Sequence, residues 1–281
     1  MENFYFETIM VHGSIFHADD VCCVALAKII NPWIKVERVL KVPEDTPEIT
    51  IICDIGGGKF DHHQEEQEYR ENGVPYASFG KMWREYGELL LPDESSRRKF
   101  DEMFVQPVDS ADNGITPNLL SATIHDMNPS FTEDGSPEAR DRRFNKAVEF
   151  MIPLIQRKIK LIKDAEDARK EVQEAVDISG TCGYVILDKF LPWQDVIVPT
   201  YKLLVIFPSN RVGYNIQAVP VEKGSFETRL NLNTGVTDEV KAQYGVSFIH
   251  PSGFLAATDT LDGAIKFAEY VMTEYVIETM L

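Results

Sequence analysis

The sequence predicts an α/β fold with a mainly parallel sheet flanked by helices, followed by a smaller α+β domain. Two observations support this prediction. In the first part of the chain, short apolar runs rich in β-branched residues alternate with helical patterns, the order that parallel strands and crossover helices produce. After Gly180, several strand-like segments follow one another instead. We therefore predict a first domain over 1–135, a helical connection over 136–180 and a C-terminal domain over 181–281.

The first domain is expected to contain three strands and at least three helices. A helix over 21–30 follows Asp19 and Asp20, either of which can cap it, and Pro32 ends it. Helical patterns recur at about 77–90 and 95–106, where Pro107 is expected to interrupt the helix. The predicted strands cover 6–12, 34–42 and 49–53.

A long charged helical pattern over 138–177 leads into the C-terminal domain. Pro153 is expected to break or kink it, and its mixed charges are typical of a solvated helix face. The segments predicted beyond it are strands near 183–188, 201–207, 212–221 and 226–232 and a helix at about 260–279.

Composition excludes several classes of protein. A net charge of −17 over 281 residues argues against a general polyanion binder, since non-specific affinity for nucleic acid comes from Lys and Arg. No apolar run approaches the ~20 residues that span a bilayer, and the N-terminus lacks the pattern of a secretion signal. The four cysteines have no zinc-ribbon spacing, and three lie in apolar runs. We expect a cytoplasmic protein with no membrane contact.

Four of the six histidines fall in two clusters with aspartates. One cluster runs from His12 to Asp20, and the other is Asp61-His62-His63, which follows an apolar run ending at Asp54. Ligands collect beyond the carboxyl ends of strands in open α/β sheets, so we expect these side chains to meet. The candidate metal ligands are His12, His17, Asp19, Asp54, His62, Asp109 and Asp112.

This ligand set predicts hydrolytic chemistry. Carboxylates mixed with imidazoles suit Mn²⁺, Fe²⁺ or Zn²⁺, whereas all-oxygen sites suit Mg²⁺. The number of ligands exceeds what one ion needs, and paired ions commonly serve phosphoester hydrolysis. His63 would remain free to bind phosphate or to protonate a leaving oxygen. The sequence leaves open whether Asp20 is a ligand or a helix-start carboxylate, and His125 is interpreted as a surface residue in a loop-like region.

The ordered motifs resemble the Myg-type (melanocyte proliferating gene product) family of metal-dependent hydrolases, within the DHH phosphoesterase superfamily. The motifs that carry the resemblance cover nearly the whole chain: 12–20, 54–57, 60–64, 108–114, 191–193, 218–220, Arg229 and 248–254. Superfamily members commonly carry Asp-x-Asp where this chain has His17-Ala-Asp19. A histidine there makes one metal site softer and less anionic.

The resemblance implies a DHH-like fold and a 3′-to-5′ exonuclease activity on RNA. It also implies one or two divalent ions, with Mn²⁺ the usual ion and Mg²⁺, Zn²⁺ or Fe²⁺ as alternatives. The resemblance further implies that the C-terminal domain contacts the substrate, and Arg229 and His250 are the candidates for this contact. Asp61 and His63 are expected to have catalytic roles. The sequence supports three hypotheses for the function. They are a phosphodiesterase or exonuclease acting on short RNA, DNA or nucleotides, a small-molecule phosphatase or pyrophosphatase, and a non-catalytic metal-binding regulator. It leaves the oligomeric state open, a homodimer included.

Overall fold

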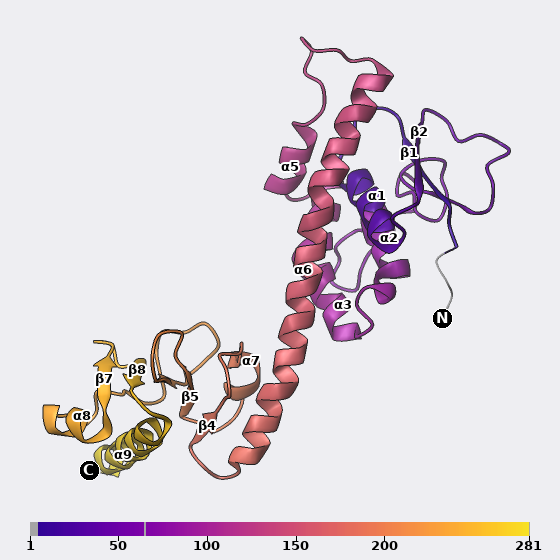
Figure 1. Cartoon of the computed structure of the whole chain (residues 1–281). Helices are drawn as coiled ribbons and strands as arrows, with labels where there is room; N and C mark the ends of the chain where they lie inside the picture. Colours follow the sequence, from indigo (N-terminus) through magenta and orange to yellow (C-terminus); the bar gives the residue numbers. More distant parts are fainter. Residues whose placement is uncertain (1–4, 65, 281) are drawn as a thin grey trace. The chain divides into compact units, whose positions relative to one another are not determined.

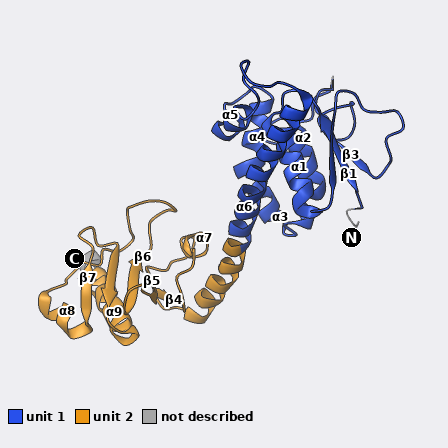
Figure 2. Ribbon diagram, turned by 45° about the horizontal axis from the view of Figure 1, so that its top comes forward, with its two compact units in different colours: residues 1–163 blue, residues 164–281 orange. Residues whose placement is uncertain are grey.

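The computed structural model of the chain describes residues 5–64 and 66–280. Its contacts divide the chain into two compact units, residues 1–163 and residues 164–281 (Figure 2). Helix α6 (Pro137–Ser179) runs through this division. One helix thus covers most of the segment predicted as a helical connection, and its two ends belong to different units, while the predicted domain bounds stay a prediction. No helix in the described part of the chain has the length and apolar character needed to cross a membrane.

The first unit is built on a parallel three-stranded sheet in the order β2-β1-β3, comprising β1 (Thr8–His12), β2 (Lys35–Val39) and β3 (Thr50–Ile52). Strands β1 and β2 are labelled in Figure 1, and β1 and β3 in Figure 2. Ile9 pairs with Val36 on one side and with Ile51 on the other. Ile9 and Val11 are fully buried and Met10 nearly so. Burial on both faces is typical of a central parallel strand covered by helices. The predicted parallel sheet is confirmed.

Strand β1 is the switch point of this sheet. The chain leaves β1 for β2 on one side and reaches β3 on the other, so the three carboxyl ends point the same way. In such sheets the crevice beyond the carboxyl ends at the switch point is where ligands bind. His12 is the last residue of β1, and Asp54 follows β3 by two residues.

The helices of the first unit are α1 (Ala18–Ile30), α2 (Ser78–Tyr86), α3 (Glu94–Phe100), α4 (Gln106–Asp112) and α5 (Leu119–His125). Every residue of α1 from Ala18 to Ala27 is buried. A 3₁₀ turn, Gly87–Leu89, follows α2. The interruption predicted at Pro107 is wrong, because a π-helical segment, Asp101–Val105, joins α3 to α4. Pro107 is the second residue of α4, and the helical backbone continues on both sides of it.

Helix α6 contributes to two hydrophobic cores. Phe144, Val148, Met151 and Ile155, spaced three or four residues apart, pack into the core of the first unit. Ala168 and Val172 pack into a core of the second unit. The helix is continuous through Pro153, so the chain does not break there. Met151 and Ile155 on either side of the proline are fully buried, and their packing offsets the lost backbone hydrogen bond.

The second unit contains a mixed sheet in the order β4-β5-β6-β8-β7. Strands β4 and β5 are parallel and the other pairs antiparallel. Helix α9 covers one face, where Phe267 and Val271 lie in the same core as Leu204 and Ile216. The elements are β4 (Tyr184–Ile186), α7 (Gln194–Ile197), β5 (Leu204–Pro208), β6 (Tyr214–Ala218), α8 (Asp238–Tyr244), β7 (Val246–Ile249), β8 (Leu255–Thr258) and α9 (Leu261–Met280).

The strand predicted over 226–232 is wrong. Only Thr228 in it forms a bridge, to Pro220. Its apolar residues Leu230 and Leu232 are buried in the core without belonging to a strand. The apolar pattern that predicts a strand over 226–232 therefore reflects the burial of an irregular segment.

Candidate metal centre

Side chains from five segments gather beyond the carboxyl ends of β1 and β3. In each of three groups, two of which share Asp54, the ligand atoms lie within 4.8 Å of one another. The groups are His12, Asp20 and Asp54; Asp54, Asp61, His62 and His63; and His17, Asp19 and Asp112. Six of the seven predicted metal ligands lie in these groups, all except Asp109. The convergence follows from topology, because strand ends and the start of a helix meet at the switch point.

Asp54 joins two of these groups. Its Oδ2 lies 3.1 Å from Nε2 of His12, and its Oδ1 lies 3.3 Å from Nδ1 of His62. The same Oδ1 accepts a hydrogen bond of 3.1 Å from the Ser78 hydroxyl. Burial alone would raise the pKa of Asp54, but the hydrogen bonds from His12 and His62 outweigh it and hold this pKa below its ordinary value. Asp54 is therefore an anion even without a bound cation.

The backbone at Asp54 is strained. Its φ of 58° is the only positive value among the non-glycine residues that the structure describes. Aspartate tolerates this left-handed region better than most residues, yet such a conformation costs about 1–3 kcal/mol. Gly56 and Gly57, also with positive φ, form the turn that follows. The segment Asp54–Gly58 is thus a tight turn that directs the Asp54 carboxylate into the site.

His62 connects Asp54 to the third group. Its Nε2 lies 3.0 Å from Oδ2 of Asp112, whose Oδ1 lies 3.7 Å from Nδ1 of His17. Burial opposes protonation of His62, but hydrogen bonds to Asp112 and Asp54 raise its pKa to about 9. In the metal-free protein His62 therefore carries the proton that balances neighbouring carboxylates.

Two buried aspartates at the start of α1 lack the partners that a buried carboxylate needs. Asp19 and Asp20 are both 0% exposed. Within the described residues, neither oxygen of Asp19 and only one oxygen of Asp20 has a hydrogen-bond partner, although Nδ1 of His62 lies 3.8 Å from Oδ2 of Asp19. Burial, together with the charges of Asp54 and Asp112, raises the pKa of Asp19 well above its ordinary value. A buried polar group without a partner costs about 1–3 kcal/mol.

The sequence left open whether Asp20 is a metal ligand or a helix-start carboxylate, and in the structure its two oxygens have different environments. Oδ1 accepts the backbone N–H groups of His17 and Val21 at 3.0 and 2.7 Å, which caps α1. Oδ2 lies 3.2 Å from Nε2 of His12, but this nitrogen has one hydrogen and is also 3.1 Å from Asp54. Burial raises the pKa of Asp20 to about 7 although His12 lowers it. Asp20 is a helix cap and also offers one oxygen to the site.

These observations fit a divalent cation. Asp19 and Asp20 are crowded by the carboxylates of Asp54 and Asp112, and Oδ2 of Asp20 must share the single Nε2 hydrogen of His12 with Asp54, an arrangement that a bound cation would stabilise. The groups combine carboxylate and imidazole donors, which suit Mn²⁺, Fe²⁺ or Zn²⁺ better than Ca²⁺. Because Asp54 belongs to two groups and His62 contacts the third, adjacent ions could share ligands.

Asp61 holds His63 in one orientation. Its Oδ1 accepts the backbone N–H of His63 at 3.0 Å and lies 2.9 Å from Nδ1 of the same residue. Its Oδ2 accepts the N–H of Gly57 at 2.7 Å. These backbone bonds help to lower the pKa of Asp61 against the opposing effect of burial. The His63 side chain is 62% exposed, so its Nε2 is available to a substrate.

Two residues that sequence reasoning missed support this turn and Asp54. Lys81 of α2 is buried and donates to the carbonyl of Asp61 at 2.9 Å. Ser78, one helical turn earlier, lies between Asp54 and His62. The sequence carried only a weak signal for Lys81, as a cation within an otherwise apolar stretch of helix.

The structure gives Asp109 other partners. Its carboxylate lies 2.7 Å from Nη2 of Arg70 and accepts the N–H of Gly80 at 3.0 Å. Burial raises its pKa to about 7 although Arg70 lowers it. Asp109 is thus engaged in joining α4 to α2, and its predicted role as a metal ligand has no support from this geometry.

Arg229 and His250 lie in the second unit. The Arg229 guanidinium donates to the backbone carbonyls of Val198, Thr200 and Lys202, with bonds of 2.5 Å to Thr200 and 2.9 Å to Lys202. His250 Nδ1 lies 2.8 Å from the Ser252 hydroxyl, and its ring contacts that of Phe254 at 4.6 Å. The guanidinium of Arg229 is already used within its own unit. Substrate contact by either residue stays a prediction.

A cavity of about 370 Å³ borders the His17–Asp112 end of the site. His125 lies on its wall, at the end of α5, although the sequence placed it in a loop. Its ring is stacked on that of His17, with centroids 6.1 Å apart and planes 21° apart. The polar residues on the wall are His17, Asp112, Asn118, Ser121, His125 and Asp126.

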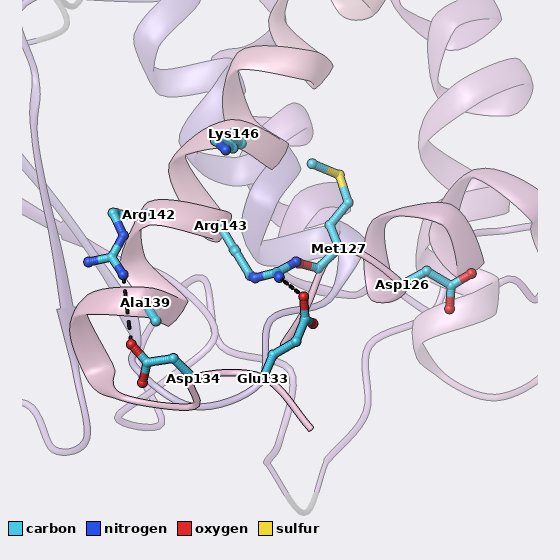
Figure 3. Close-up of a pocket in the computed structure, with 8 residues that line it drawn as sticks. All are labelled: Asp126, Met127, Glu133, Asp134, Ala139, Arg142, Arg143 and Lys146. Atoms are coloured by element: carbon cyan, nitrogen blue, oxygen red, sulfur yellow. Dashed lines mark hydrogen bonds and ion pairs between the residues drawn. The ribbon is translucent and has the colours of Figure 1, made fainter. Parts of the chain in front are cut away.

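A second cavity, of about 690 Å³, lies between the start of α6 and the segment after α5 (Figure 3). Arg143 pairs with Glu133, and Arg142 lies 3.9 Å from Asp134. Three acidic and three basic side chains therefore share the wall, and most are paired. The residues around it are Asp126, Met127, Glu133, Asp134, Ala139, Arg142, Arg143 and Lys146. It presents no uncompensated basic track for a polyanion.

The fold and the site together define an α/β protein with a carboxylate–histidine centre suited to divalent cations. The chain belongs to the MYG1_exonuc family, described as Uncharacterised protein family (UPF0160), whose model matches residues 8–272. The resemblance to the Myg-type family is confirmed, whereas membership of the DHH superfamily stays a prediction.

Similar proteins come from several eukaryotes. A "MYG1 protein" of Dictyostelium discoideum is 24% identical, with 93% of this chain and 95% of that protein aligned. The human "MYG1 exonuclease" is 25% identical, with 95% of this chain and 86% of that protein aligned. The rat "MYG1 exonuclease" is 26% identical, with 95% and 84% aligned. No solved structure matches the chain.

Proposed function

We propose that the chain is a metal-dependent phosphodiesterase that acts as an exonuclease on short RNA or on nucleotides. One observation carries the proposal: both oxygens of buried Asp19 and one oxygen of buried Asp20 have no hydrogen-bond partner among the described residues, inside a cluster of histidines and aspartates at the sheet's switch point. The names of the human and rat relatives, MYG1 exonuclease, support nucleic acid as the substrate. Mn²⁺ is the proposed ion because the mixed donor set suits Mn²⁺, Fe²⁺ or Zn²⁺ and the resemblance to the DHH superfamily implies Mn²⁺ as the usual one.

The proposed ligands are His12, His17, Asp19, Asp20, Asp54, His62 and Asp112. When bound, divalent ions supply an activated water and neutralise charge on phosphoryl oxygens. Asp61 orients His63 through Nδ1, which leaves Nε2 of His63 to hydrogen-bond the phosphate or to protonate the leaving oxygen. His62 must lose its proton before it can act as a ligand, since a protonated imidazole has no free lone pair.

The substrate is proposed to be short because the wall of the adjoining cavity offers little to a long polyanion. No Lys or Arg occurs among the described residues that line it. The same observation favours a second candidate function, a small-molecule phosphatase or pyrophosphatase acting through the same groups.

The test is release of mononucleotides from an end-labelled RNA oligomer by the full chain with Mn²⁺. The expected result is metal-dependent release that Asp54→Asn abolishes. RNA left intact while a nucleoside monophosphate or pyrophosphate is hydrolysed would select the second function. No turnover of any of these phosphoesters with Mn²⁺, Mg²⁺, Zn²⁺ or Fe²⁺ would reject both and leave the non-catalytic alternative.

A further inference from the structure

We propose that the cavity beside His17 and Asp112 holds the nucleoside attached to the scissile phosphate, with its base stacked on His125. This inference rests on the proposed function and identifies the part of the substrate that the site recognises. The cavity of about 370 Å³ falls in the range of ligand sites, roughly 300–1,000 Å³. Because His17 and Asp112 belong both to its wall and to a metal-binding group, a ligand there has one end at the proposed ions.

Charge decides which part of a nucleotide can occupy the cavity. Its described wall contains the carboxylates of Asp112 and Asp126 and no Lys or Arg. A phosphate away from the ions would face uncompensated like charge, which is unfavourable in a partly desolvated site. A sugar and a base carry no charge at neutral pH. The cavity therefore fits the neutral part of a nucleotide, and the phosphate belongs at the His17–Asp112 end.

His125 supplies a flat surface for a base. Its ring is exposed and nearly parallel to that of His17, with 21° between the planes. Nucleobases splayed from single strands stack on aromatic side chains, histidine included. Such stacking tolerates any base, because every base has a π-face. The subsite would thus be selective for nucleosides without being selective for sequence.

Polar groups suited to a sugar lie on the same wall. The Asn118 side-chain oxygen already accepts the N–H groups of Leu120 and Ser121, which leaves its amide nitrogen as a donor. Asp126 adds a carboxylate, the group that accepts ribose hydroxyls in dinucleotide sites.

The test compares two probes that differ only in the base. Isothermal titration of the Mn²⁺-loaded full chain with adenosine 5′-monophosphate and with ribose 5-phosphate measures what the base contributes. The expected preference for adenosine 5′-monophosphate is roughly 5- to 150-fold, the range for one stacked base. His125→Ala is expected to abolish the preference and His125→Phe to retain it, because a phenyl ring stacks without imidazole chemistry. Leu119→Ala is the matched control, since Leu119 lies on the same helix, is 85% exposed and is outside the wall.

The outcomes separate this inference from the proposed function. Equal affinity of the wild type for the two probes, an unchanged preference in His125→Ala, or failure of His125→Phe to restore it would overturn the stacking role. Intact RNA in the hydrolysis assay, together with a base-dependent preference that needs an aromatic ring at 125, would refute the proposed function and leave a nucleotide-binding cavity. Hydrolysis without any base preference would uphold the function and refute the subsite.

Discussion

Asp19→Asn is expected to stabilise the metal-free protein while removing its response to metal. Asp19 is fully buried, and neither oxygen has a hydrogen-bond partner in the described structure. Nδ1 of His62 lies 3.8 Å from its Oδ2, but burial and the carboxylates of Asp54 and Asp112 dominate and raise its pKa. An asparagine of the same shape carries no charge, and its NH₂ group can donate to those carboxylates. The substitution therefore removes an unfavourable interaction and adds a favourable one, but only where no cation is bound.

The expected magnitude follows from the cost of an unsatisfied buried group, about 1–3 kcal/mol. For a protein of this size that corresponds to a rise in Tm of roughly 2–12 °C. The sign depends on pH. Because the pKa of Asp19 is raised in the folded state, the folded protein binds more protons than the unfolded chain above pH 3.8. Wild-type stability falls as pH rises through this interval, whereas asparagine does not titrate. The gain in stability of the Asp19→Asn variant over the wild type should therefore be small near pH 4 and largest at alkaline pH.

Thermal unfolding in EDTA between pH 4 and 8.5, repeated with Mn²⁺, measures both effects. Mn²⁺ at about 100 times its Kd should stabilise the wild type by ~2.7 kcal/mol and the variant by far less. Asp109→Asn is the matched control, since Asp109 is equally buried but paired with Arg70. It should destabilise by about 3–5 kcal/mol because Arg70 loses its partner, and the folded variant should still respond to Mn²⁺. An Asp19→Asn protein that is less stable than wild type in EDTA at pH 8, or equally stabilised by Mn²⁺, would refute this reasoning.

Three further predictions concern other parts of the chain. Gly80→Ala should cost about 3–5 kcal/mol in chemical denaturation, because the added Cβ would lie 1.9 Å from Asp109 Oδ2 and 2.6 Å from Arg70 Nη2; the usual helix gain from alanine would contradict this. The pKa of His62 is about 9 in the folded protein against an ordinary value of 6.5. Protonated His62 therefore stabilises the metal-free protein fully below pH 6.5, and roughly 3 kcal/mol of this stability is lost as the pH rises towards 9. His62→Gln should flatten the dependence of stability on pH, and an equally steep fall in this variant would exclude His62 as the cause of that dependence. Arg229→Met should lower the stability of the second unit by about 2–5 kcal/mol, because backbone carbonyls lose a charged donor; weaker substrate binding at unchanged stability would instead support the predicted substrate contact.

The gathering of the site residues could be predicted because it depends on topology. His12 and Asp54 follow parallel strands, and the histidine–aspartate segment between them begins the helix after β1. Parallel strands bring their carboxyl ends to one edge, so no side-chain detail was needed. The parallel sheet itself was readable from apolar runs separated by helical patterns. In the second unit apolar runs predict strands less well, because buried residues of an irregular segment, such as Leu230, produce the same pattern.

The separation of Asp109 from Asp112 could not be predicted. Residues three apart in an α-helix are neighbours, but they differ by about 60° around the axis and ~4.5 Å along it. A short aspartate side chain cannot span that difference. Asp109 reaches Arg70 and Gly80, whereas Asp112 reaches His62 and His17. The choice was set by Arg70, whose position depends on a loop that carries no periodic signal.

The two kinds of aspartate in the site indicate how it can remain folded without metal and still bind it. Asp54 is compensated by His12 and His62, although its backbone is strained. Asp19 accepts no described hydrogen bond, and burial together with the neighbouring carboxylates raises its pKa and so favours its protonated form. A divalent cation would replace the protons on His62 and Asp19, so binding must release protons and tighten as pH rises. Because the metal-free fold loses stability over the same pH range, metal should contribute most to stability where the free protein is weakest.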